Sequence, residues 1–103
     1  MSLILRTAAD LSAERAAALR AEITAAIDAF VETQARRLGY NSAAHCASYV
    51  ASTVPDWAAE AQAFVAWRDA VWLAAFTGLS EVAAGKPLPS VEEAVARLPL
   101  WKA

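Results

Sequence analysis

Between residues 11 and 38, large apolar residues recur every three or four positions, which is the spacing of one face of an α-helix. These positions are Leu11, Leu19, Ile23, Ile27, Phe30, Val31 and Leu38. Asp10 or Ser12 can accept the first free backbone N–H groups of such a helix, and Gly39 permits the left-handed turn that often ends one. The pattern therefore predicts a first helix over about 11–38.

Residues that favour helix ends divide the rest of the chain into three further helices. The markers, in chain order, are Asn41 or Ser42, Thr53 with Pro55, Gly85, Ser90 with Glu92 and Glu93, and Pro99. They predict helices over about 42–52, 55–84 and 91–98. With only 3 glycines and 4 prolines, the chain has few residues that break helices, so we expect an all-α protein.

Two of the predicted helices are long for a chain of 103 residues. Each would measure about 40 to 45 Å, whereas a compact domain of this size has a radius of gyration of about 13 Å. We therefore expect a single domain, residues 1–103, in which the long helices form an antiparallel hairpin with the short helix at the corner. The hairpin has more apolar surface than it can cover, so we expect a homo-oligomer, in the first place a dimer, to complete a helical bundle.

Composition and charge exclude several classes of protein. The 9 basic and 11 acidic side chains give a net charge of -2, which offers no basic patch for nucleic acid. The lone Cys46 excludes an internal disulfide and a thiolate metal cluster and fits a reducing compartment. The apolar start of the chain is too short for a signal peptide, and no run approaches the roughly 18 apolar residues of a membrane helix. We expect a cytoplasmic protein that binds neither nucleic acid nor a membrane.

The third predicted helix carries an unusually wide apolar arc. Centred on Phe64, the arc includes Trp57, Val65, Trp67, Val71, Trp72, Phe76, Leu79 and Val82. It spans about half the circumference, whereas packing on one partner needs roughly a 100° stripe. This helix is therefore expected to touch the first helix and also a second subunit or a different protein. Its tryptophans, Trp57, Trp67 and Trp72, are either core residues or interface anchors.

Arg68 is the charged residue near the middle of this arc, where an unpaired guanidinium is unfavourable. One interpretation is a structural ion pair with an acidic residue of the first helix: Asp28, Glu32 or Glu22. The other is that Arg68 forms, with Trp67 or Trp72, a recognition spot for a partner's carboxylate or ring. Asp69 points about 100° away from Arg68 on the helix, so the two are not expected to face one site.

The sequence contains little that suggests catalysis. His45 and Cys46 are neighbours on a short helix and point in different directions, so we expect a buried thiol and a histidine bonded to Tyr49. One histidine and one cysteine are too few for a zinc site. The three glycines are scattered and form no phosphate loop, and Gly78, within the third helix, is explained by a close helix approach. We expect no enzyme activity, no cofactor and no metal.

Four stretches of the chain carry a resemblance to known proteins. They are GYNSAA at 39–44, CASY at 46–49, AQAFVAWRDAVW at 61–72 and GKPLPSVEE at 85–93. The chain resembles small phage and prophage proteins encoded among tail and tail-fibre genes, with AWRDAVW as the most specific block. The resemblance implies a tail-associated structural, accessory or assembly protein and no defined catalytic residue.

Two functional hypotheses follow. In the first, the protein is a tail or tail-fibre assembly or accessory factor, cytoplasmic or carried in the virion. It would bind a phage structural protein without catalysis, through the arc that contains Trp67, Arg68, Trp72, Phe76 and Trp57. In the second, the protein is a bacterial cytoplasmic helical module or small regulator. Its tryptophan stripe would then close its own homo-oligomer.

Overall fold

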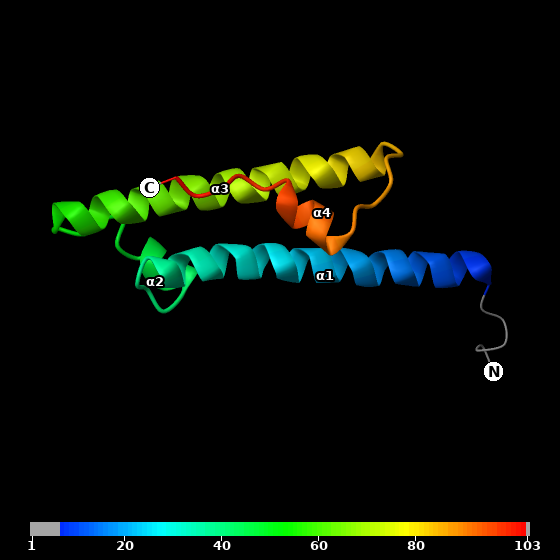
Figure 1. Ribbon diagram of the computed structural model, residues 1–103, viewed down its shortest axis with the longest axis horizontal. Helices are drawn as coiled ribbons and strands as arrows, with labels where there is room; N and C mark the ends of the chain where they lie inside the picture. Colours follow the sequence, from blue (N-terminus) through cyan, green and yellow to red (C-terminus); the bar gives the residue numbers. More distant parts are fainter. Residues whose placement is uncertain (1–6, 103) are drawn as a thin grey trace.

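The computed structural model describes residues 7–102, which contain four α-helices and no β-strand. The helices are α1 (Ala8–Arg37), α2 (Ala43–Ala47), α3 (Pro55–Ala83) and α4 (Val91–Ala96). The two long helices, α1 with 30 residues and α3 with 29, run antiparallel and side by side (Figure 1). The predicted all-α fold with a long helical hairpin is confirmed.

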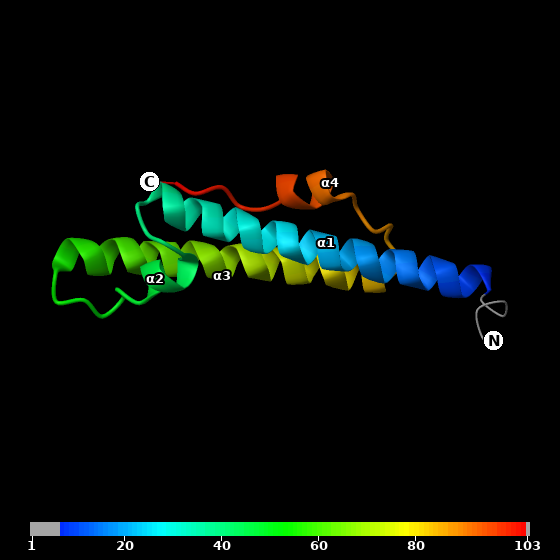
Figure 2. The same ribbon diagram turned by 90° about the horizontal axis from the view of Figure 1, so that it is seen from below.

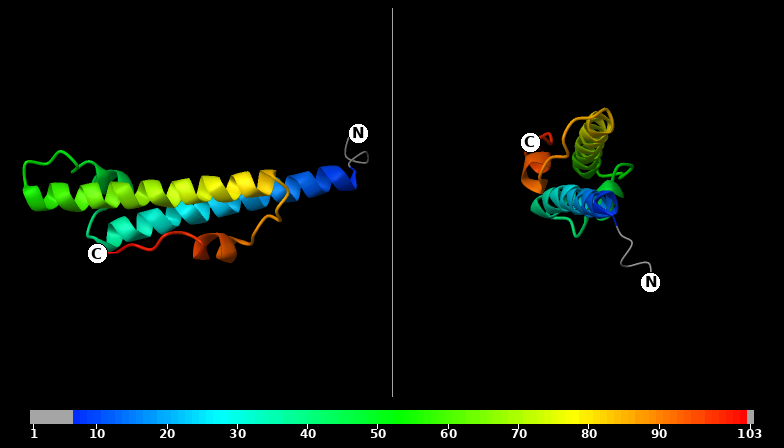
Figure 3. Two further views of the ribbon diagram at one scale, coloured as in Figure 1. Left: turned by 90° about the horizontal axis from the view of Figure 1, so that it is seen from above. Right: turned by 90° about the vertical axis from the view of Figure 1, so that its right-hand side faces the viewer.

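The short elements lie on opposite faces of this hairpin (Figure 2). α2 lies where the hairpin turns, whereas α4 and the segment that follows it lie on the other face (Figure 3). The long helices are staggered, so that the N-terminal end of each projects beyond the other. The radius of gyration of the Cα atoms is 17.9 Å and the molecule measures 61 × 29 × 20 Å, so the protein is a rod.

α1 begins at Ala8, earlier than the apolar pattern indicates, because Thr7 is its N-cap. The Thr7 hydroxyl accepts a hydrogen bond from the Asp10 backbone N–H (3.0 Å), and the Thr7 N–H donates to the Asp10 carboxylate (3.1 Å). The predicted caps, Asp10 or Ser12, are wrong, because Asp10 is the third helical residue of this capping box. At the other end Gly39 has a φ of 100°, which confirms the predicted left-handed stop.

α2 is much shorter than the helix predicted over 42–52. Ser42, one of the two predicted caps, begins it by accepting a hydrogen bond from the His45 backbone N–H (3.0 Å). The helix ends at Ala47, and the Ser48 hydroxyl donates to the His45 carbonyl oxygen (2.6 Å). Serine side chains that bond to nearby backbone disfavour helix interiors, which explains the early end.

α3 begins at Pro55 as predicted, but Thr53 does not cap it. The N-cap is Val54, whose side chain makes no capping hydrogen bond, and Pro55 has no N–H to satisfy. The capping box of α4 is confirmed: the Ser90 hydroxyl accepts from the Glu93 N–H (3.1 Å), and the Ser90 N–H donates to the Glu93 carboxylate (3.2 Å). These hydrogen bonds from Ser90 lower the pKa of Glu93.

The two glycines near the end of α3 differ in their roles. Gly85 has a φ of 107° and follows the last turn of the helix, as predicted. Gly78 was expected to permit a close helix approach, but nothing lies within 4 Å of a Cβ atom built on it. That expectation is wrong, because α1 and α3 separate towards this end of the hairpin (Figure 1).

The core lies in the half of the hairpin that contains the turn. Its buried residues are Ile27, Val31, Ala35, Cys46, Ala61, Phe64, Trp67, Val71 and Leu98. We call α1 from Ile27 onwards together with α3 up to Val71 the turn half, and the remaining parts of the two helices the open half. Within residues 7–102, α1 has no buried residue before Ile27 and α3 has none after Val71. The open half therefore leaves apolar side chains partly exposed.

Candidate functional site

Trp67, one of the five candidate residues on α3, belongs to the protein's own core. Only 9% of its surface is exposed, and its indole N–H donates to the Pro99 carbonyl oxygen (2.9 Å). Its ring stands edge-on to Trp101, with 5.8 Å between the ring centroids. Trp67 therefore holds the C-terminal segment, residues 98–102, against α3. No pattern in the sequence singles out Trp101, because no helical period follows Pro99.

Arg68 pairs with its neighbour in the sequence. Its Nε and Nη2 atoms donate to Asp69 Oδ1 (3.1 and 2.9 Å), and 35% and 57% of the two side chains are exposed. The predicted partner on α1 is therefore wrong, whether Glu22, Asp28 or Glu32. The expectation that the adjacent side chains would not face one site is also wrong, because the arginine side chain is long enough to reach the carboxylate of the next residue. A cation and an anion thus lie side by side near the middle of α3.

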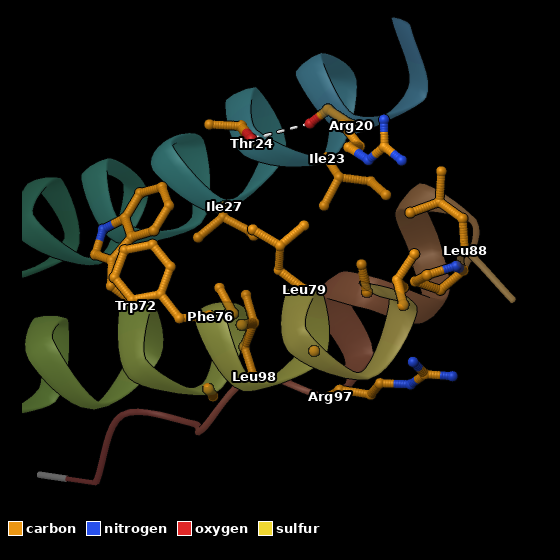
Figure 4. Close-up of a pocket in the computed structure, with 16 residues that line it drawn as sticks. Arg20, Ile23, Thr24, Ile27, Trp72, Phe76, Leu79, Leu88, Arg97 and Leu98 are labelled. Carbon is orange, nitrogen blue, oxygen red and sulfur yellow. Dashed lines mark hydrogen bonds between the residues drawn. The ribbon is translucent and has the colours of Figure 1, made fainter. Parts of the chain in front are cut away.

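Trp72, Phe76 and Leu79 form an apolar patch on the open half of α3, here called the α3 patch. The rings of Trp72 and Phe76 are in contact, with centroids 6.3 Å apart. Trp72 is half-buried, whereas Phe76 and Leu79 are 57% and 51% exposed. Their side chains point from α3 towards α1 (Figure 4).

Trp57 lies far from the α3 patch, at the N-terminal end of the same helix. It is 52% exposed and stands edge-on to Tyr49, with 5.8 Å between the ring centroids. Val50 and Val54, in the connection between α2 and α3, are also exposed. We call Val50, Val54 and Trp57 the turn knob. The structure does not bring Trp57 together with Trp72 and Phe76.

A hollow of about 140 Å³ adjoins the α3 patch, between α1, α3 and α4. Its walls include Ile23 and Ile27 of α1, the three side chains of the α3 patch, and Leu98 after α4. α4 lies behind the two long helices in Figure 4, and the full ribbon views place it on one face of this half of the hairpin, with α2 on the opposite face at the turn. The predicted helix stripe already contains Ile23 and Ile27, but nothing in the sequence indicates that α4 would close the space beside them.

Two arginines, Arg20 on α1 and Arg97 after α4, also line the hollow. Within residues 7–102, neither lies within salt-bridge distance of an acidic side chain, although the charge of Arg97 contributes to the lowered pKa of Glu93. Both guanidinium groups lie on the side of the hollow near Leu88 (Figure 4). The hollow is therefore apolar inside and positively charged at its edge. Sequence analysis singled out neither arginine.

The polar side chains of the turn half serve to attach α2. The Tyr40 hydroxyl donates to Glu60 Oε1 (2.7 Å), and this bond together with burial raises the pKa of Tyr40 to about 12. The Asn41 backbone N–H donates to His45 Nδ1 (3.0 Å), and the Tyr49 hydroxyl lies 3.5 Å from His45 Nε2, the contact that was predicted. Burial of the neighbouring Cys46 raises the pKa of its thiol to about 11, so the thiol is held in its unreactive, protonated form.

Within the described part of the chain, no metal site or membrane-spanning helix points to a function, and no known relative does so either. Within residues 7–102, no group of three or more His, Cys, Asp or Glu side chains is placed to hold a metal ion. None of α1 to α4 is both long and apolar enough to cross a membrane. No protein family, curated protein or solved structure matches the chain.

Proposed function

We propose that this protein acts by binding other protein chains through the α3 patch and the adjoining hollow, without catalysis. The observation that carries the proposal is the exposure of Phe76 and Leu79, at 57% and 51%, beside the half-buried Trp72. Large apolar side chains grouped on a surface mark sites of protein association, and tryptophan and other large anchors dominate the energy of such interfaces. Leu73, which a helical wheel centred on Phe64 places on the opposite face of α3, is 64% exposed and is not among the residues that line the hollow.

The partner we propose is a phage tail or tail-fibre protein, with this chain as an assembly or accessory factor made in the cytoplasm of the host cell. The support is the resemblance carried by the AWRDAVW block, residues 66–72. Two residues of that block, Arg68 and Trp72, keep part of their side chains accessible, and both lie on α3 next to or within the α3 patch. Trp67 supports the partner surface indirectly, by holding the C-terminal segment in place.

The test is an affinity pull-down of the tagged protein from cells in which the phage is induced, with mass spectrometry of the recovered chains. We expect a tail or tail-fibre protein in a fixed ratio. Phe76→Ala and Trp72→Ala should reduce its recovery at least about tenfold, because each removes a central anchor. Arg68→Ala should reduce it less, since Arg68 is partly exposed and already paired with Asp69, and such a surface charge contributes less than a buried anchor.

The matched control is Leu100→Ala. Leu100 is also a large exposed apolar side chain, at 73%, but it belongs to the C-terminal segment, which follows α4 along the face of the hairpin opposite to α2. Recovery with this variant should equal that of the unchanged protein, and circular dichroism should show the same helix content for all four variants. Unchanged recovery with Phe76→Ala, Trp72→Ala and Arg68→Ala would remove the α3 patch as the binding site.

A second candidate function is a homo-oligomeric helical module or small regulator of a bacterial cytoplasm. The observation that favours it is that the turn knob and the α3 patch leave apolar side chains exposed at both ends of α3. Two copies could cover such surfaces reciprocally. A pull-down that returns only this chain, in a fixed ratio, would favour this candidate over the tail-associated one.

A further inference from the structure

We infer that two copies of this chain form a symmetric dimer in which the turn knob of each copy inserts into the hollow of the other. The inference rests on the proposed function only in taking the α3 patch to be a protein-binding surface. The dimer adds to the proposed function an occupant for the hollow in the free protein, the residues in contact and the symmetry of the contact.

The turn knob projects from the same face of the rod on which the hollow opens. α2 and the connection to α3 stand out from one face at the turn, and α4 covers the opposite face (Figures 2 and 3). Seen from the side opposite to α4, the hollow is lined by Trp72, Phe76 and Leu79 (Figure 4). This face therefore has a protrusion over one half of its length and a depression over the other half.

Such a surface is complementary to itself when one copy is turned by 180°. A two-fold axis across the middle of α3 would place the protrusion of each copy over the depression of the other, which is the self-complementary contact of a closed dimer. Trp57 and Leu79 are separated by 22 positions in the sequence, or about 33 Å of helix. The midpoint between them is Arg68.

The charges near the proposed axis fit this arrangement. Arg68 and Asp69 lie side by side at the centre, so each could face the oppositely charged residue of the second copy. At the ends, Asp56 directly precedes Trp57 in the first turn of α3, and Arg20 lines the hollow. Neither Asp56 nor Arg20 has a salt-bridge partner within residues 7–102. Insertion of the turn knob would bring these opposite charges towards each other.

The size of the hollow also suits the turn knob. Its volume is about 140 Å³, and an engineered cavity of roughly 150 Å³ in another protein accepts benzene. One six-membered ring therefore fits inside, and the rest of an indole would lie in the open mouth. Trp57, which is 52% exposed and held from one side by Tyr49, presents such a ring.

The first test is the molar mass of the free protein by light scattering over a range of concentrations. We expect a dimer whose dissociation constant rises at least about tenfold with Trp57→Ala and with Phe76→Glu. The matched control, Leu100→Glu, places the same charge on a large apolar residue of the C-terminal segment that is 73% exposed, against 57% for Phe76, and should leave the dimer intact. A monomer at all concentrations, or a dimer indifferent to both variants, would overturn the proposal.

The second test fixes the register by disulfide formation. The double variant Trp57→Cys with Leu79→Cys should form covalent dimers on oxidation at protein concentrations above its raised dissociation constant, because the two positions meet across the interface. Each single variant should not, since the two copies of either position lie far apart along the antiparallel helices. Cys46 is buried and is the same in every variant. Efficient cross-linking of Trp57→Cys alone would exclude this arrangement.

These results separate the dimer from the proposed function. A monomer that still captures a partner through Phe76 would overturn the dimer and leave the proposed function standing. A dimer with the expected cross-link that captures no tail protein would establish the dimer, and the tail-associated function would fail.

Discussion

The two halves of the hairpin use similar apolar side chains in opposite ways. In the turn half, Phe64 and Val71 are completely buried, whereas Phe76 and Leu79, on the open half of the same helix, are more than half exposed at 57% and 51%. α2 and the C-terminal segment cover opposite faces of the turn half, but only one face of the open half is covered, by α4. The difference shows that the covering elements decide whether an apolar residue becomes core or surface.

The largest expected difference in stability between the two halves comes from removing one phenylalanine ring from each. Phe64→Ala should lower the free energy of unfolding by about 3–5 kcal/mol, because it empties a packed site. Phe76→Ala should lower it by less than about 1 kcal/mol, since the ring is already 57% exposed. Urea unfolding followed by circular dichroism, at concentrations where the protein is monomeric, measures both. Equal losses would show that the open half is as well packed as the turn half.

Alkaline pH should weaken the turn half selectively. The pKa of Cys46 rises from 9.0 to about 11 and that of Tyr40 from 10.0 to about 12, so the folded protein holds both protons more tightly than the unfolded chain does. Between pH 9 and pH 12 the unfolded chain therefore binds fewer protons, and stability falls as the pH rises. For Cys46 alone, a pKa raised from 9.0 to about 11 corresponds to a loss of about 3 kcal/mol.

The measurement is urea unfolding at a series of pH values from 8 to 12. Cys46→Ala should remove the part of the loss that begins near pH 9 and leave the part due to Tyr40. A stability that stays constant up to pH 12 would contradict the proposed linkage.

A smaller effect concerns the link between α3 and the C-terminal segment. Trp67→Phe keeps a ring but removes the indole N–H, so the Pro99 carbonyl oxygen loses its 2.9 Å hydrogen bond. We expect a loss of about 1–2 kcal/mol and faster tryptic cleavage after Arg97. Cleavage after Arg15, near the distant end of α1, is the internal control and should not change. Unaltered cleavage after Arg97 would mean that the ring alone holds the segment.

The smallest expected effect is a gain in stability instead of a loss. Gly78→Ala should stabilise the protein by about 0.5–1 kcal/mol, because alanine favours a helix interior and nothing lies within 4 Å of the added Cβ atom. Thermal unfolding measures the change. A loss of stability would show that the open half is more tightly packed at Gly78 than the structure indicates.

The features that the sequence predicted correctly depend on local chemistry. Gly39 and Gly85 end the long helices because they adopt positive φ angles, and Ser90 begins α4 through a capping box with the residue three positions on. Each of these outcomes depends on a few neighbouring residues. The error at the start of α1 has a local cause as well, since Thr7 competes with Asp10 for the same role.

The features that the sequence did not predict depend on how elements are placed relative to one another. A helical wheel puts Trp67 and Phe76 on one wide arc, and Trp67 becomes a core residue because Phe30 of α1 and the C-terminal segment both pack against it. Whether an acidic side chain of α1 reaches Arg68 depends on the stagger of α1 against α3, which no local pattern encodes. The hollow could not be predicted either, because its lining residues come from three helices.

The contact between Trp67 and Trp101 has an optical consequence. The two indoles are 5.8 Å apart and almost perpendicular, at 88°. Their electronic transitions are close enough to couple, which gives a circular dichroism signal in the ultraviolet that depends on the distance and angle between the rings. This signal should vanish when the C-terminal segment detaches, even while α1 and α3 remain helical. The protein thus contains a natural spectroscopic probe that follows one contact separately from helix content.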